Sequence, residues 1–186
     1  RKKRLTLIAV VGQILDRENP RSMLHILDLE KLLPDYEIVH IGGVKSTVFL
    51  SEYLDLLEKN RSSIKFYENL NENEKIEILS SSKYLIRFGK NEYGPGMPVI
   101  EAISSGVPLI MNVGIGSSEM IKEFKAGYVL EKVNAQAIAN LIIHTDDVEY
   151  ASLVTNTLIL RDSWSWKDHA EALLKLSENE FSKKQE

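Results

Sequence analysis

The segment "YLIRFGKNEYGPGMPVIEAISSGVPLIM" (84–111) contains the pattern that decides the fold. It opens with the apolar run Tyr84–Phe88, which predicts a strand buried on both faces. A turn rich in glycine and proline follows, and then a predicted helix at Pro98–Ser105 that ends at Gly106. The next run, Val107–Met111, is again apolar. A strand, a helix and a strand in this order predict two parallel strands joined by a crossover helix.

The same alternation continues on both sides of this segment. The strands that we expect before and after it are Leu5–Val11, Tyr36–Ile41, Ile64–Tyr67 and Gly127–Leu130. The other predicted helices are Pro20–Leu33, Val48–Leu57, Asn71–Ser80, Ser117–Phe124, Ala135–Ile143, Val148–Leu160 and His169–Leu176. This order predicts an α/β fold, a doubly wound, Rossmann-like parallel sheet with helices on both faces.

Composition limits the classes of function. The 186 residues fit one domain or one lobe of a larger enzyme, and 44% of them are apolar, enough for a core. A net charge of −4 argues against a dedicated nucleic-acid binder. The absence of cysteine excludes thiolate metal sites and cysteine nucleophiles. No apolar run approaches the ~18 residues of a transmembrane helix.

We expect three segments along the chain. The basic start, 1–4, is interpreted as a linker or the edge of a longer chain, because no apolar signal region follows it. Residues 5–177 form the predicted lobe. Residues 178–186 are a polar tail.

The turn in the opening segment suggests a ligand site. In doubly wound sheets, ligands bind beyond the carboxyl ends of the strands, where Gly94-Pro95-Gly96 lies. With Pro98 in the first helical turn, free N–H groups and the helix dipole favour an anion such as a diphosphate. Glu101 then has two interpretations: it serves the helix dipole, or it accepts hydrogen bonds from the vicinal diol of a ribose.

Other familiar motifs are incomplete. "GGVKST" (42–47) lacks the glycine before its lysine that a P-loop requires, and "GIGSSE" (114–119) lacks the third glycine of a dinucleotide fingerprint. The four histidines are too scattered to indicate a metal site.

The stretch "EYGPGMPVIEAISSGVPLI…GIGSSEMIKEFKAGYVL", with "DSWSWKDHA" after it, resembles the nucleotide-sugar-binding half of family 4 retaining glycosyltransferases, which have the GT-B fold. The match runs in order from about residue 5 to residue 176. The resemblance implies that Glu101 holds the donor ribose and that Glu92, a candidate catalytic residue, lies near the transferred sugar. It also implies donor contacts from the backbone of Gly94, Gly96 and Met97 and from Ser117, Ser118 and Glu119.

Two departures concern the loops that face the donor. Eight residues separate Glu92 from Glu101, whereas the family has seven, and the seven-spaced position is Tyr93. The family also has arginine after the first-strand glycine and a lysine before the next helix, but here Gln13 follows Gly12 and the lysine position is Asn19.

Three further basic residues could supply that missing charge. Arg17 and Arg21 lie close to the departures and are candidates for the diphosphate; otherwise they begin a solvated helix. The fourth strand ends "RFGK" where the family often has proline-serine, so Arg87 or Lys90 is a further candidate.

The resemblance implies sugar transfer from a nucleoside diphosphate sugar to an unknown acceptor, with retention, no bound metal and no resident cofactor. The acceptor would bind a missing N-terminal lobe, without which we expect no catalysis. We expect a cytoplasmic protein, with peripheral membrane contact through the absent lobe left open, and no nucleic-acid partner. The alternatives are a degenerate, non-catalytic binding or scaffolding module and, ranked below it, a nucleotide-sugar epimerase.

Overall fold

The computed structural model describes residues 6–11, 20–43, 47–89, 94, 96–163, 171 and 174–175. Strands and helices alternate through these residues as the sequence predicts. The elements are β1 (Thr6–Val11), α1 (Pro20–Leu32), β2 (Tyr36–Ile41), α2 (Thr47–Lys59), β3 (Lys65–Tyr67), α3 (Glu72–Ser80), β4 (Ser82–Arg87), α4 (Met97–Ser104), β5 (Leu109–Asn112), α5 (Ser118–Phe124), β6 (Gly127–Leu130), α6 (Ala135–His144) and α7 (Asp147–Ser163). Of the last predicted helix, the described residues Glu171, Leu174 and Lys175 are helical.

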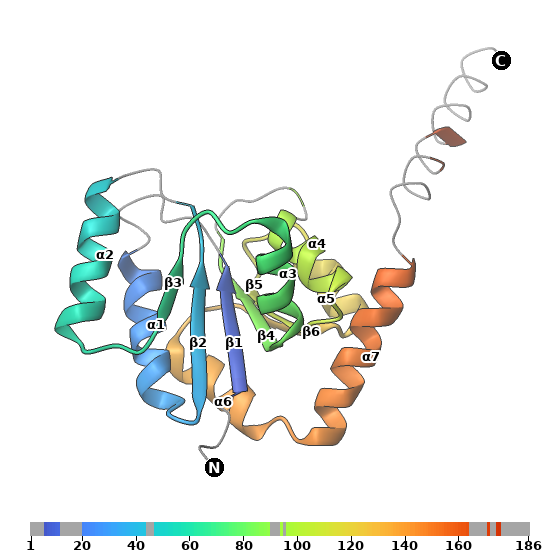
Figure 1. Cartoon of the computed structure of the whole chain (residues 1–186). Coiled ribbons are helices and arrows are strands. Elements are labelled where there is room, and N and C mark those ends of the chain that lie inside the picture. The colour runs from blue at the N-terminus through green and yellow to red at the C-terminus, as the bar shows by residue number, and fades with distance from the viewer. Residues whose placement is uncertain are drawn as a thin grey trace.

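The strands form one parallel sheet in the order β3-β2-β1-β4-β5-β6 (Figure 1). The chain builds outward from β1 to β3 and then returns to place β4 on the other side of β1. From β4 it continues outward to β5 and β6. The order of the strands therefore reverses between β1 and β4, and this reversal is the switch point at which doubly wound sheets bind ligands.

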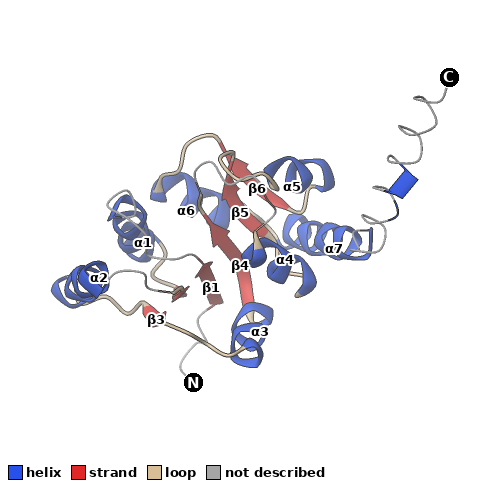
Figure 2. Ribbon diagram, turned by 90° about the horizontal axis from the view of Figure 1, so that it is seen from above, coloured by secondary structure: helices blue, strands red, loops and turns tan. Residues whose placement is uncertain are grey.

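Helices cover both faces of the sheet (Figure 2). Helices α1, α2 and α6 lie on one face, and α3, α4 and α5 lie on the other. Helix α7 contacts α4 and α5 and contributes Leu153 to the first core and Leu160 to the second. Successive side chains of β4 alternate between the two cores: Tyr84 and Ile86 pack with the first set, and Leu85 packs with the second. All three are fully buried, as a central strand of a two-sided sheet requires. The predicted doubly wound α/β fold is confirmed.

Asparagine caps fix the start of two helices. The side chain of Asn71 accepts a hydrogen bond from the Glu74 N–H at 3.0 Å, and the Glu74 carboxylate accepts one from the Asn71 N–H at 3.1 Å. This reciprocal capping box sets the first turn of α3. Asn134 caps α6 in the simpler way, by accepting from the Ala137 N–H at 2.7 Å.

Candidate functional site

The first turns of α3 and α4 lie beside the switch point of the sheet. Helix α3 follows β3 and helix α4 follows β4. Both helices therefore begin at the edge where the parallel strands end (Figure 1). The two helices contact each other on the same face of the sheet. The first turns of both helices therefore lie at the edge of the sheet where the sequence predicts a ligand site.

The start of α4 has a glycine N-cap and a proline in its first turn. Its N-cap, Gly96, has a φ of 72°, a left-handed value that glycine adopts without strain. Pro98 follows in the first turn, as predicted, and has no N–H to donate. No described side chain caps this helix end, and only the Val99 and Ile100 N–H groups reach back to the Gly96 carbonyl. The N–H of Met97 therefore stays at the helix terminus, where the dipole favours negative charge.

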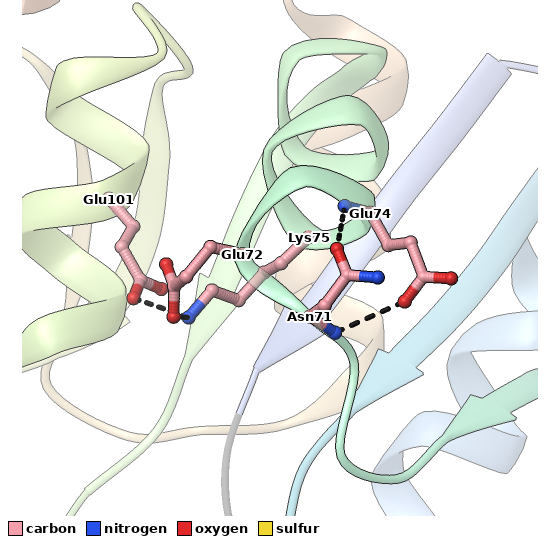
Figure 3. A network of polar contacts seen from close by, with 5 residues as sticks. All are labelled: Asn71, Glu72, Glu74, Lys75 and Glu101. Carbon is pink, nitrogen blue, oxygen red and sulfur yellow. Dashed lines mark hydrogen bonds and ion pairs between the residues drawn. The ribbon is translucent and has the colours of Figure 1, made fainter.

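The carboxylate of Glu101 is paired with Lys75 of α3 (Figure 3). The Lys75 ammonium donates to Glu101 Oε1 at 2.7 Å and also contacts Glu72 Oε1 at 3.2 Å. The side chains of Lys75 and Glu101 are only 17% and 15% exposed, whereas that of Glu72 is 76% exposed. A carboxylate this deeply placed requires an opposite charge, and Lys75 supplies it.

The same contacts hold the ammonium in its charged form. Burial acts to lower the pKa of Lys75, but hydrogen bonds to Glu101 and Glu72 outweigh burial, and the pKa lies above its ordinary value of 10.5. The sequence interpretation missed Lys75. Its spacing from Glu72 is that of an ordinary helix-surface pair, and Glu101 lies 26 positions further along the chain, too far for a local signal.

The side chain of Asn112 fixes the start of the loop that contains Gly94. The Gly89 N–H donates to Asn112 Oδ1 at 3.0 Å, and Asn112 Nδ2 donates to the Gly89 carbonyl at 2.8 Å. The backbone ladder between β4 and β5 ends at the pair Arg87 and Met111. The Asn112 amide therefore continues this pairing beyond the strands and sets where the chain leaves the sheet.

The other predicted site residues within the described ranges differ in position and in how exposed their side chains are. Ser117 and Ser118 begin α5 as expected but are only 4% and 5% exposed, so their side chains offer little surface to a ligand. Arg21 lies in the first turn of α1. Arg87 is half-buried at the end of β4, and its Nη1 donates to the Phe88 carbonyl at 3.3 Å. Met97 is 63% exposed at the start of α4.

Several predictions fall on residues outside the described ranges. They are Gly12, Arg17, Lys90, Glu92, Tyr93 and the segments 1–4 and 178–186. Their proposed roles remain predictions. Among the described residues, no group of three or more acidic or histidine side chains is arranged to hold a metal ion.

The fold and the helix termini at its switch point define the class of the protein, a doubly wound α/β domain with a ligand edge between β1 and β4. The sequence then gives the family. A sequence model of the family described as glycosyl transferases group 1 matches residues 1–156, and the chain belongs to this family. No curated protein sequence matches the chain.

Solved structures of glycosyltransferases share the fold. WaaG, a glycosyltransferase involved in lipopolysaccharide biosynthesis, matches with a TM-score of 0.69 and 19% identity over 89% of this chain and 44% of its own. The C-terminal domain of a group 1 family glycosyl transferase, LpcC from Francisella tularensis, matches with a TM-score of 0.69 and 21% identity over 85% of each chain. Sucrose-phosphate synthase from Thermosynechococcus elongatus matches with a TM-score of 0.74 and 18% identity over 98% of this chain and 47% of its own. The chain thus spans less than half of the two longer proteins.

Proposed function

We propose that this chain is the donor-binding lobe of a glycosyltransferase that moves a sugar from a nucleoside diphosphate sugar to an acceptor. The observation that carries the proposal is the partly buried carboxylate of Glu101, one turn into a helix that begins at the switch point. A carboxylate accepts hydrogen bonds from both hydroxyls of a vicinal diol. A helix N-terminus stabilises the phosphate charge beside it. Together they match the ribose and the diphosphate of one nucleotide.

In this proposal the donor binds along α4 and the loop that precedes it. The ribose hydroxyls donate to Glu101, and the diphosphate lies against the backbone of Gly94, Gly96 and Met97. Glu92 lies near the transferred sugar. In this proposal Arg17 or Arg21 adds positive charge at the diphosphate, because the leaving group carries more negative charge as its bond to the sugar breaks.

Membership of the family and the sequence resemblance support the proposed reaction. We propose transfer with retention of the anomeric configuration and no bound metal, the helix dipole and basic side chains neutralising the diphosphate. The acceptor would bind a second lobe, which is also where any peripheral membrane contact would lie. No helix among the described residues is long and apolar enough to cross a bilayer.

A second candidate is a binding or scaffolding module without catalytic activity. The ion pair between Lys75 and Glu101 favours it, because the carboxylate already has a partner in the free protein. The family's arginine and lysine are also replaced by Gln13 and Asn19. This candidate predicts that the protein binds no nucleotide or binds one without turning it over.

Calorimetric titration tests the donor site, and turnover of the matching nucleoside diphosphate sugar then separates an enzyme from a binding module. The full-length protein that contains this chain is titrated with UDP, GDP and ADP, first as wild type and then as Glu101→Ala. Glu77→Ala is the matched control, because Glu77 is an exposed glutamate on the neighbouring helix α3. We expect saturable binding of one nucleotide that Glu101→Ala abolishes and Glu77→Ala preserves. Absence of binding to all three nucleotides would refute the donor site.

A further inference from the structure

Lys75 is the charged partner of Glu101 at the candidate site. Lys75 reaches from α3 across to α4 and contacts a single oxygen, Oε1, of the Glu101 carboxylate at 2.7 Å (Figure 3). Both side chains are largely shielded from water, at 17% and 15% exposure. An ion pair at this depth restricts the carboxylate far more than an exposed surface pair does.

We propose that Lys75 is a positioning residue for the donor: it fixes Glu101 through Oε1 and leaves Oε2 to accept the hydrogen bonds of the ribose diol. This inference rests on the proposed function. A carboxylate has two oxygens and about four acceptor sites, so one ammonium hydrogen bond leaves acceptors for two hydroxyls. Lys75 and Glu101 therefore serve the ribose as a unit.

The gain from this arrangement is preorganisation. A free glutamate side chain samples several rotamers, and its ordering on binding costs conformational entropy. Lys75 removes part of that cost before the nucleotide arrives, because it holds the carboxylate in one orientation. A fixed carboxylate also presents its free oxygen to the ligand without reorganisation.

The lysine is itself held in place. The capping box of Asn71 and Glu74 fixes the first turn of α3, from which Lys75 extends. Glu72 adds a second contact at 3.2 Å, but its side chain is 76% exposed, so water competes for it. The orientation of the Lys75 side chain is therefore set by the capped helix and by Glu101 rather than by Glu72.

Three variants of the full-length protein test the role. Lys75→Met keeps the length of the side chain and removes its charge, and Lys75→Arg keeps the charge. Lys31→Met is the control, because Lys31 forms an exposed pair with Asp28 at 3.5 Å on the opposite face of the sheet. Each protein is titrated with the nucleoside diphosphate that the wild type binds and with its 2′,3′-dideoxy analogue, which lacks the diol. Thermal unfolding checks that each variant folds.

We expect Lys75→Met to weaken binding of the ribonucleotide by about two- to tenfold, the scale of ordering one side chain on binding, and to leave binding of the dideoxy analogue unchanged. Lys75→Arg recovers part of the loss, and Lys31→Met binds like the wild type. Equal weakening for both nucleotides would overturn the inference, because it would show only a general structural role.

Tighter binding by Lys75→Met would also overturn the inference, because it would show that the lysine competes with the ribose for Glu101. If Lys75→Met does not fold, Lys75→Gln takes its place, because it also removes the charge: a loss specific to the ribonucleotide supports positioning, and equal weakening for both nucleotides, or no loss for either, refutes it. A wild type that binds no nucleoside diphosphate is a different result, since it refutes the proposed function from which this inference starts.

Discussion

Replacing Asn112 with alanine removes both hydrogen bonds that connect β5 to the start of the 89–97 loop. The bonds join Asn112 to the N–H and the carbonyl of Gly89 at 3.0 and 2.8 Å. Each neutral hydrogen bond contributes about 1 kcal/mol to stability, so we expect a loss of about 2 kcal/mol in the free energy of unfolding. The site is half-buried, which limits how well water replaces the amide.

Urea unfolding followed by circular dichroism measures this loss. Asn60→Ala is the control, because it removes a single exposed bond, from Asn60 Nδ2 to the Leu56 carbonyl at 2.8 Å. We expect the control to lose under about 1 kcal/mol and the slope against denaturant to stay the same in both variants. If Asn112→Ala lay within about 0.5 kcal/mol of wild type, the amide would not anchor the loop, and the proposed geometry before α4 would lose its support.

Gly127→Ala is expected to destabilise the fold by about 1–3 kcal/mol in thermal or urea unfolding, because the added Cβ would lie 2.0 Å from the Leu109 carbonyl oxygen. Gly94→Ala is the control, because a Cβ added there would meet no described atom within 4 Å. Equal stability of the two variants would contradict the packing around Gly127. The raised pKa of Lys75 means that its stabilising charge is fully present below 10.5 and is lost as the pH rises through the pKa of the folded protein. Lys75→Met should therefore cost stability at about pH 8 and less at about pH 11.5, and a constant difference would count against the ion pair. Glu92→Ala should lower turnover of the full-length enzyme more than its nucleotide affinity, and unchanged turnover would make Tyr93 or a backbone group the better candidate.

The fold was predictable because its signals are local. Apolar runs that end in glycine mark strands buried on both faces, and Pro20, Asn71 and Pro98 mark the starts of helices to within one residue. The place of Glu101 one turn into a helix followed from the same signals. These features depend on neighbouring residues only, so no tertiary information was needed.

The contacts that complete the candidate site were not predictable in this way. Lys75 meets Glu101 only because α3 and α4 pack side by side on one face of the sheet. Asn112 substitutes for a backbone pair only because β5 lies beside β4. The burial of Ser117 and Ser118 likewise depends on packing around α5 rather than on local sequence. Each of these facts requires the three-dimensional arrangement of distant segments.

The central claim is that Glu101 binds the ribose of a nucleoside diphosphate, and a crystal structure of the full-length protein with that nucleotide tests it most directly. We expect a carboxylate oxygen of Glu101 within about 2.5–3.0 Å of a ribose hydroxyl, with the diphosphate at the first turn of α4. A nucleotide bound with its ribose away from Glu101 would contradict the account.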